Sequence, residues 1–234
     1  MRILIYGAGV IGSLYAALFA ESGVETAVYA RGRRLQDLRR DGLRFEKSGS
    51  ILRANVRVLE ALPENDIYDF VFLTVRENQL HEALAQLRDN KSPCIVTMVN
   101  SLEDYCIWEQ LCGGERILPA FPGAGGGFEN GVLHAGLTPG LIQPTTFGIL
   151  SHKQEPEAER LKALLKRAKV PYQQVTDMHA WQLCHLAMVV PIADAYYESD
   201  DPANVGADRR IMAHTAKTLR ENFRTLARSG IRLS

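Results

Sequence analysis

The stretch Arg2-Ile3-Leu4-Ile5-Tyr6-Gly7-Ala8-Gly9-Val10-Ile11-Gly12 decides the fold of this chain. Its first five residues are mostly apolar and predict a strand, and the apolar residues from Ser13 to Ser22 predict a helix. The glycines between them form a G-x-G-x-x-G pattern in the strand-to-helix context that indicates a dinucleotide site. Gly7 allows a tight turn, Gly9 leaves the backbone open to a pyrophosphate, and Gly12 lets the helix pack closely on the strand.

The start of this helix is the expected ligand contact. The first N–H groups of a helix lack internal partners and carry partial positive charge, which suits a pyrophosphate. We therefore expect the whole loop to contact a cofactor: Gly7, Ala8, Gly9, Val10, Ile11 and Gly12. The alternative interpretation is a glycine-rich turn with a structural role only.

The residues after the second predicted strand, Glu25–Ala30, indicate which dinucleotide is bound. An NAD site usually places an acidic residue here to accept hydrogen bonds from the ribose. This chain has Arg31, Arg33 and Arg34 instead. A guanidinium can bind a 2′-phosphate through two parallel hydrogen bonds, so we predict NADP(H), with Arg31 as the first contact and Arg34 as a second. The alternative is that these arginines form a solvated helix start.

Composition narrows the class of protein. The chain has 234 residues, a hydrophobic fraction of 46% and no net charge, which predicts a packed core and no general binding of nucleic acid. No apolar run reaches the roughly 18 residues that span a bilayer, and the first strand leaves no room for a signal peptide. The cysteines form no C-x-x-C pair and have no His at zinc-ligand spacing. We expect a cytoplasmic protein with reduced cysteines and no metal site.

Predicted strands and helices alternate through the first three quarters of the chain. The pattern predicts strands at 43–45, 55–58, 68–75, 94–99 and 116–120, and helices at 35–40, 78–87 and 103–111. Such alternation predicts the α/β class, with a doubly wound Rossmann-type parallel sheet.

The pattern changes from Gly123 onward. Residues 123–127 are nearly all glycine and predict a loop that leads into a hairpin, with ligand binding as the alternative. Antiparallel edge strands are expected at 131–135 and 144–150, a helix at 156–168 and a last strand at 170–175. Everything after Asp177 reads as helix. We therefore predict a dinucleotide-binding Rossmann domain over residues 1–176 and a small, partial all-helical domain over residues 177–234.

Two further strand ends carry candidate site residues, because open parallel sheets bind ligands outside the carboxyl ends of their strands. One predicted strand ends at Val75 and presents Arg76, which can pair with a substrate carboxylate or a cofactor phosphate, or form a surface salt bridge with Glu77 or Glu82. The next strand presents Asn100, which can orient a nicotinamide ribose or a substrate carbonyl. The alternative role for Asn100 is a helix N-cap. We expect Val75, Arg76 and Asn100 to contact the cofactor.

Taken in order, these strand ends resemble the ketopantoate reductases (2-dehydropantoate 2-reductases). The resemblance is carried by the G-A-G-V-I-G loop, the arginine after the second strand, T-V-R-E-N-Q at 74–79, V-N-S-L at 99–102, G-V-L-H at 131–134 and a Trp-led helix at 181–191. It implies an NADPH-binding Rossmann domain, a helical domain and a branched 2-oxo acid reduced between them, as in pantothenate biosynthesis. It also implies a lysine on the first long helix of the second domain that protonates the oxyanion.

The chain departs from the family pattern at its chemical centre. The family usually has Lys at the place of Arg76 and Gly at the place of Ser101. The segment 181–191 contains neither Lys nor Asn, and the position of the family lysine is taken by Gln182 or Leu183. The family's late substrate-binding helices also fall beyond Ser234. The resemblance is therefore to a divergent or truncated member.

His185 is the candidate replacement for the missing lysine. It lies four residues after Trp181, so the two share one helix face. A histidine with a pKa of about 6.5 can donate a proton near neutral pH. The alternative role for His185 is a packed core residue, and His134 and His179 are weaker candidates for the donor.

Two functions follow from these expectations. The first is an NADPH-dependent oxidoreductase that reduces a small 2-oxo acid, with Asn100 and His185 as catalytic residues. The second is a non-catalytic NADP(H)-binding protein, a sensor or a partner subunit, that has lost the lysine. The predicted helix from Asp208 to Ser229 has an apolar stripe, which favours core packing or, as the alternative, a homodimer interface.

Overall fold

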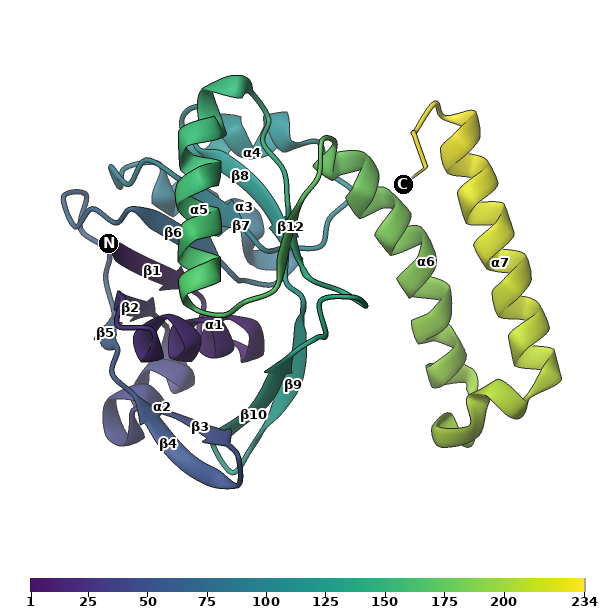
Figure 1. Ribbon diagram of the computed structural model, residues 1–234, viewed down its shortest axis with the longest axis horizontal. Coiled ribbons are helices and arrows are strands. Elements are labelled where there is room, and N and C mark those ends of the chain that lie inside the picture. Colours follow the sequence, from purple (N-terminus) through teal and green to yellow (C-terminus); the bar gives the residue numbers. More distant parts are fainter. Residues whose placement is uncertain (234) are drawn as a thin grey trace. The chain divides into compact units, whose positions relative to one another are not determined.

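The computed structural model describes residues 1–233. Two compact units divide the chain, one from Met1 to Thr176 and one from Asp177 onward. Strands and helices alternate in the first unit, and the second unit is a pair of long helices (Figure 1).

An eight-stranded sheet is the centre of the first unit. Its order is β12-β11-β8-β7-β6-β1-β2-β5, and the six strands from β8 to β5 are parallel. Because β1 lies between β2 and β6, the chain reverses direction across the sheet at β1, which confirms the predicted doubly wound topology. The strands are β1 (Arg2–Tyr6), β2 (Glu25–Tyr29), β5 (Arg57–Leu59), β6 (Phe70–Leu73), β7 (Ile95–Thr97), β8 (Ile117–Phe121), β11 (Thr145–Phe147) and β12 (Tyr172–Gln174).

Helices cover both faces of this sheet, because successive side chains of a buried strand point to opposite faces. On β1, Ile3 and Ile5 join the core that α1 (Val10–Glu21) and α5 (Glu155–Arg167) complete. Tyr6 points to the opposite face and donates a hydrogen bond to Gln86 of α3 (Leu80–Leu87). The same face carries α4 (Tyr105–Cys112), and Figure 1 shows α1 and α5 in front of the sheet with α3 and α4 behind it. Shorter helices are α2 (Gly32–Asp41), η1 (Glu77–Gln79) and η2 (His152–Gln154).

A second, four-stranded sheet packs on α1, in the order β4-β3-β10-β9. It corrects two expectations. The glycine-rich segment at 123–127, predicted as a loop, lies mostly in β9 (Ala124–Glu129), which pairs antiparallel with β10 (Val132–Leu137). A Cβ on Gly126 would lie 2.3 Å from the His134 carbonyl oxygen, so glycine here lets two strands approach closely. The antiparallel partner of β3 (Leu43–Lys47) is β4 (Ser50–Ala54), a strand that the prediction missed.

The second unit consists of α6 (Met178–Glu198), the short helix η3 (Pro202–Ala207) and α7 (Arg209–Arg228). Both long helices begin at an Asp cap: the Asp177 carboxylate accepts a hydrogen bond from the Ala180 N–H, and that of Asp208 accepts two, from Arg210 and Ile211. On the predicted apolar stripe of α7, Ile211 is buried and the last members are half-buried. Within residues 1–233, no helix combines the length and apolar character needed to cross a membrane.

Pro191 lies inside α6 and removes one backbone donor from it. That N–H would otherwise bond to the carbonyl of Ala187, four residues earlier. Instead, the side-chain amide of Asn222 on α7 donates to the Ala187 oxygen at 3.1 Å. One side chain therefore joins the two helices and satisfies the acceptor that the proline leaves open.

We expect Asn222→Ala to lower the free energy of unfolding by about 1–2 kcal/mol, because the half-buried Ala187 carbonyl loses the donor that replaces the missing backbone N–H. Pro191→Ala restores the helical N–H, so the cost of Asn222→Ala should fall in that background. Urea unfolding of the two single variants and the double variant measures this coupling. Additive effects would show that Asn222 does not compensate for the proline.

Candidate functional site

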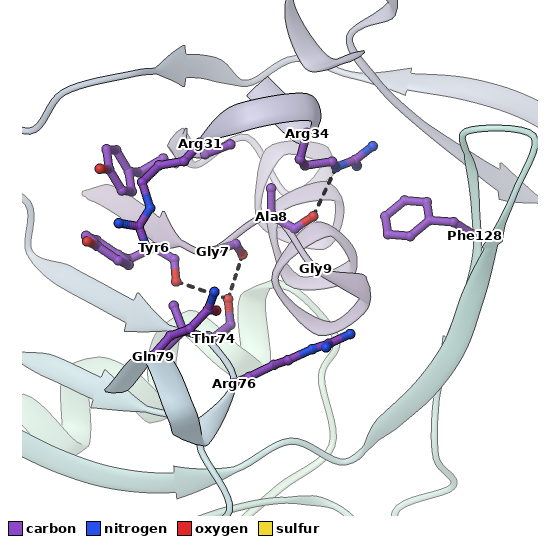
Figure 2. A pocket seen from close by; sticks show the side chains of 13 residues that line it. Tyr6, Gly7, Ala8, Gly9, Arg31, Arg34, Thr74, Arg76, Gln79 and Phe128 are labelled. Carbon is purple, nitrogen blue, oxygen red and sulfur yellow. Dashed lines mark hydrogen bonds between the residues drawn. The ribbon is translucent and has the colours of Figure 1, made fainter. Parts of the chain in front are cut away.

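A cavity of about 400 Å³ opens where β1, β2 and β6 end (Figure 2). This is the point at which the strand order reverses, the usual ligand position in an open α/β sheet. The glycine loop follows β1, Arg31 and Arg34 follow β2, and Thr74, Val75 and Arg76 follow β6. The full lining is Tyr6, Gly7, Ala8, Gly9, Tyr29, Ala30, Arg31, Arg34, Thr74, Val75, Arg76, Gln79 and Phe128.

The glycines of the loop occupy three different environments. Gly7 has a φ of 112°, which other residues rarely adopt. A Cβ on Gly12 would lie 2.0 Å from the Gly7 oxygen and 2.4 Å from the Thr74 hydroxyl oxygen, so α1 requires glycine there to pack on β1 and β6. A Cβ on Gly9 would meet nothing within 4 Å. The backbone at Gly9 is thus open to a ligand, and the loop geometry fits a dinucleotide pyrophosphate.

Thr74 fixes the loop from the neighbouring strand. Its N–H donates to the Tyr6 carbonyl at 2.9 Å, and its hydroxyl donates to the Gly7 carbonyl at 2.7 Å. These bonds tie the end of β6 to the turn after β1. Val10 and Ile11 follow the loop in the first turn of α1, are half-buried and do not line the cavity.

Arg31 follows β2 and occupies the N-cap position of α2 without a capping hydrogen bond from its side chain. One guanidinium nitrogen, Nη1, lies 2.5 Å from Oε1 of Glu82 on α3, and the hydrogen bond between them raises the pKa of Arg31. The Arg31 side chain remains 42% exposed. A cationic, accessible group therefore stands at the β2 edge of the cavity with a carboxylate beside it.

Arg34 is not part of a solvated helix start, which corrects that alternative. Its Nε donates to the Ala8 carbonyl at 3.0 Å and its Nη2 to the Ser13 hydroxyl at 3.2 Å. The guanidinium carbon lies 4.3 Å from the centre of the Phe128 ring, and burial lowers the pKa of Arg34. Figure 2 shows the side chain pointing toward the loop.

Arg76 lines the cavity and is exposed. Neither predicted salt bridge forms: the Glu77 carboxylate accepts a hydrogen bond from Ser101 at 3.0 Å, and that of Glu82 pairs with Arg31. Within residues 1–233, no ion pair involves Arg76. Its charge is available to an anion in the cavity.

Asn100 is exposed in the loop between β7 and α4, outside the lining of the cavity. It is not the helix N-cap, since the N-cap of α4 is Asp104, whose carboxylate accepts a hydrogen bond from the Cys106 N–H. The loop is held by Glu103, which accepts hydrogen bonds from His81 and Trp108, each at 2.8 Å. These contacts hold the pKa of Glu103 below its usual value.

His185 lies on α6 in the second unit. Its ring stacks on that of Trp181, with centroids 5.1 Å apart and planes 9° apart, as the shared helix face predicts. Burial lowers the pKa of His185. His179 is half-buried on the same helix, and His134 is exposed on β10.

Several cavity residues were not predicted. Thr74 and Gln79 belong to the strand-end motif at 74–79, so the sequence carried a signal for them. Tyr6 and Tyr29 are strand residues with ring centroids 4.5 Å apart. Phe128 gave no local signal, because it reaches the cavity only through the pairing of β9 with β10.

The family model described as Ketopantoate reductase PanE/ApbA matches residues 3–148, more than half of the chain. The chain belongs to this family. The match includes every residue that lines the cavity. The resemblance inferred from the strand ends is thus confirmed.

Two curated relatives carry the name 2-dehydropantoate 2-reductase. The one from Mesorhizobium japonicum is 36% identical over 107 residues, which covers 44% of this chain and 32% of the relative. The one from Pyrococcus horikoshii is 24% identical over 188 residues, or 78% of this chain and 58% of the relative. The matches thus span about a third and just over half of the relatives' lengths.

Solved structures share the fold at low identity. A D-mandelate dehydrogenase, in a ternary structure with NADH and anilino(oxo)acetate, has a TM-score of 0.82 at 19% identity, over 100% of this chain and 76% of that one. A PanE/ApbA family ketopantoate reductase from Ralstonia eutropha has a TM-score of 0.80 at 18% identity, with the same coverage. Both likenesses establish the architecture.

We expect Gly12→Ala and Gly9→Ala to differ sharply in stability. The Gly12 variant forces a Cβ into backbone contact, so its free energy of unfolding should fall by about 3 kcal/mol or more. The Gly9 variant enters open space with a φ of −71°, so its stability should change by less than about 1 kcal/mol. Chemical denaturation measures both values, and equal losses would contradict the packing role of Gly12.

Proposed function

We propose that the chain binds NADP(H) in the cavity at the ends of β1, β2 and β6 and reduces a small 2-oxo acid. One observation supports this function above the others: the open backbone at Gly9 and the start of α1 meet an exposed arginine, Arg31, across one cavity of about 400 Å³. Unpaired helix N–H groups and an arginine together suit a dinucleotide with an additional phosphate.

Each part of the cavity has a proposed role. The loop from Gly7 to Gly12 holds the pyrophosphate, and Arg31 holds the 2′-phosphate. Val75 and Arg76 contact the cofactor from the end of β6, and Asn100 orients the nicotinamide ribose or the substrate carbonyl. When bound, the reduced cofactor supplies the hydride that passes to the keto carbon.

The names of the relatives support the oxidoreductase class. Two curated relatives are called 2-dehydropantoate 2-reductases, and a structural neighbour is a D-mandelate dehydrogenase with NADH. Their names share oxidation and reduction at a carbon next to a carboxylate. We therefore propose a ketopantoate-like 2-oxo acid as the substrate.

Arg31→Ala should weaken NADPH binding about ten- to a hundredfold and NADH binding by less than about threefold, because only NADPH presents the 2′-phosphate. Glu82→Gln removes the carboxylate 2.5 Å from Arg31, so it should strengthen NADPH binding and leave NADH binding nearly unchanged. Fluorescence titration with both cofactors measures the four constants. Equal losses of both cofactors in Arg31→Ala would refute the predicted NADPH preference.

A second candidate function is a non-catalytic NADP(H)-binding protein. One observation favours it: α6, the helix that begins the second unit, contains no lysine to match the family's proton donor. Positioning of hydride and carbonyl contributes to rate independently of a proton donor, so the enzyme remains our first proposal. NADPH oxidation with a panel of 2-oxo acids separates the two, since binding without turnover of any acid supports the second.

We propose His185 as the proton donor of the reductase. Burial lowers the pKa of His185, so the imidazolium loses its proton at a pH below the usual value of about 6.5. Turnover should therefore decline as the pH rises toward neutrality. His185→Gln should lose about 10²- to 10⁴-fold in turnover and keep its NADPH affinity. The pH profile of both proteins tests this, and full turnover in His185→Gln would exclude the role.

A further inference from the structure

The Ala8 carbonyl, at the centre of the glycine loop, is held by two side chains. Arg34 Nε donates to it at 3.0 Å, and the Ser13 hydroxyl donates to it at 3.2 Å. Arg34 Nη2 donates in turn to the Ser13 oxygen at 3.2 Å. The three groups form a closed triangle that links α2, α1 and the loop.

Phe128, on β9 of the four-stranded sheet, contacts the Arg34 guanidinium of this triangle. Its ring centre lies 4.3 Å from the Arg34 guanidinium carbon, and the ring also lines the cofactor cavity. The Phe128 residue is 39% exposed and Arg34 is half-buried, so the contact adds a modest cation–π attraction to the hydrogen bonds of Arg34. The strand β9, which carries Phe128, therefore restrains a side chain that in turn restrains the loop.

Holding the Ala8 carbonyl has a direct consequence for the loop. The peptide between Ala8 and Gly9 is planar, so a fixed carbonyl also fixes the Gly9 N–H on the opposite side. Arg34 and Ser13 thus determine the direction of a backbone donor in the part of the loop that is open to a ligand.

We propose that Arg34, covered by Phe128, is a positioning residue of the glycine loop and not a ligand of the 2′-phosphate. Its Nε and one Nη group are directed to the loop and to Ser13, whereas Arg31 bonds to an exposed glutamate on another helix. The two arginines then have separate tasks: Arg31 selects NADPH, and Arg34 orders the loop that any dinucleotide uses. The binding part of this inference rests on the proposed function.

Amide hydrogen exchange without any cofactor tests the loop directly. Two reporters are the Gly7 N–H, bonded to the Tyr29 carbonyl at 3.2 Å, and the Ser13 N–H, bonded to the Gly9 carbonyl at 2.9 Å. We expect Arg34→Ala to speed exchange at these amides about tenfold, and Phe128→Ala to do so by a smaller factor. The Val71 N–H, bonded to Cys94 in the centre of the sheet, should not change.

The matched control is Arg39→Ala, which removes an arginine from the same helix. Arg39 pairs with Glu60 at 2.8 Å and, in the part of the chain that the structure describes, forms no hydrogen bond or ion pair with the loop, so its loss should leave loop exchange unchanged. Arg34→Lys serves as a second variant if Arg34→Ala does not fold. It keeps the cation but lacks the planar pair of donors, so loop exchange should still rise.

Cofactor titrations supply the second readout. Arg34→Ala should weaken NADPH and NADH by similar factors, about five- to twentyfold, so that their affinity ratio changes by less than about twofold. A loss specific to NADPH would make Arg34 a phosphate ligand and overturn the inference, as would unchanged loop exchange in Arg34→Ala and Arg34→Lys. If the wild-type chain binds neither cofactor, the proposed function fails, and loop exchange still decides the role of Arg34.

Discussion

The contact between α1 and the strands beneath it governs the architecture of the first unit. At Gly12 the helix comes so close to the Gly7 carbonyl and the Thr74 hydroxyl that no side chain fits between them. This approach brings the first turn of α1 to the ends of β1 and β6, where the strand order reverses. The N–H groups at the start of α1 reach the cavity at the edge of the sheet because Gly12 has no side chain.

The three arginines around the cavity differ in how firmly their side chains are held. Arg76 has no ion-pair partner within residues 1–233, Arg31 shares its charge with an exposed glutamate, and Arg34 is half-buried against the loop. A charge that is held in place orders its surroundings, whereas an accessible charge can meet a ligand. Arg34 thus stabilises the loop, whereas the exposed Arg31 and Arg76 can contact an anion in the cavity.

The second unit shows how a departure from the family pattern is accommodated. Its first helix keeps the Trp and the Pro of that pattern, has Gln182 or Leu183 where the lysine is expected, and contains neither lysine nor asparagine. The Trp–His stack and the bond from Asn222 to the Ala187 carbonyl give this helix polar and aromatic contacts of its own. Helix α6 therefore forms without the family lysine, so the absence of this residue affects the proposed reaction and not the helix.

The sequence by itself determined the doubly wound sheet, the family and the loop that enters the cavity, because strand periodicity and glycine spacing are local properties. It also brought Arg31, Arg76 and the strand end at Val75 to notice, since residues after parallel strands share one edge. Only the tertiary structure decided that residues 124–129 form a strand, that Phe128 reaches the cavity and that Arg34 turns toward Ala8. Those outcomes depend on pairing between β9 and β10 and on contacts between residues far apart in the chain, which no local pattern encodes.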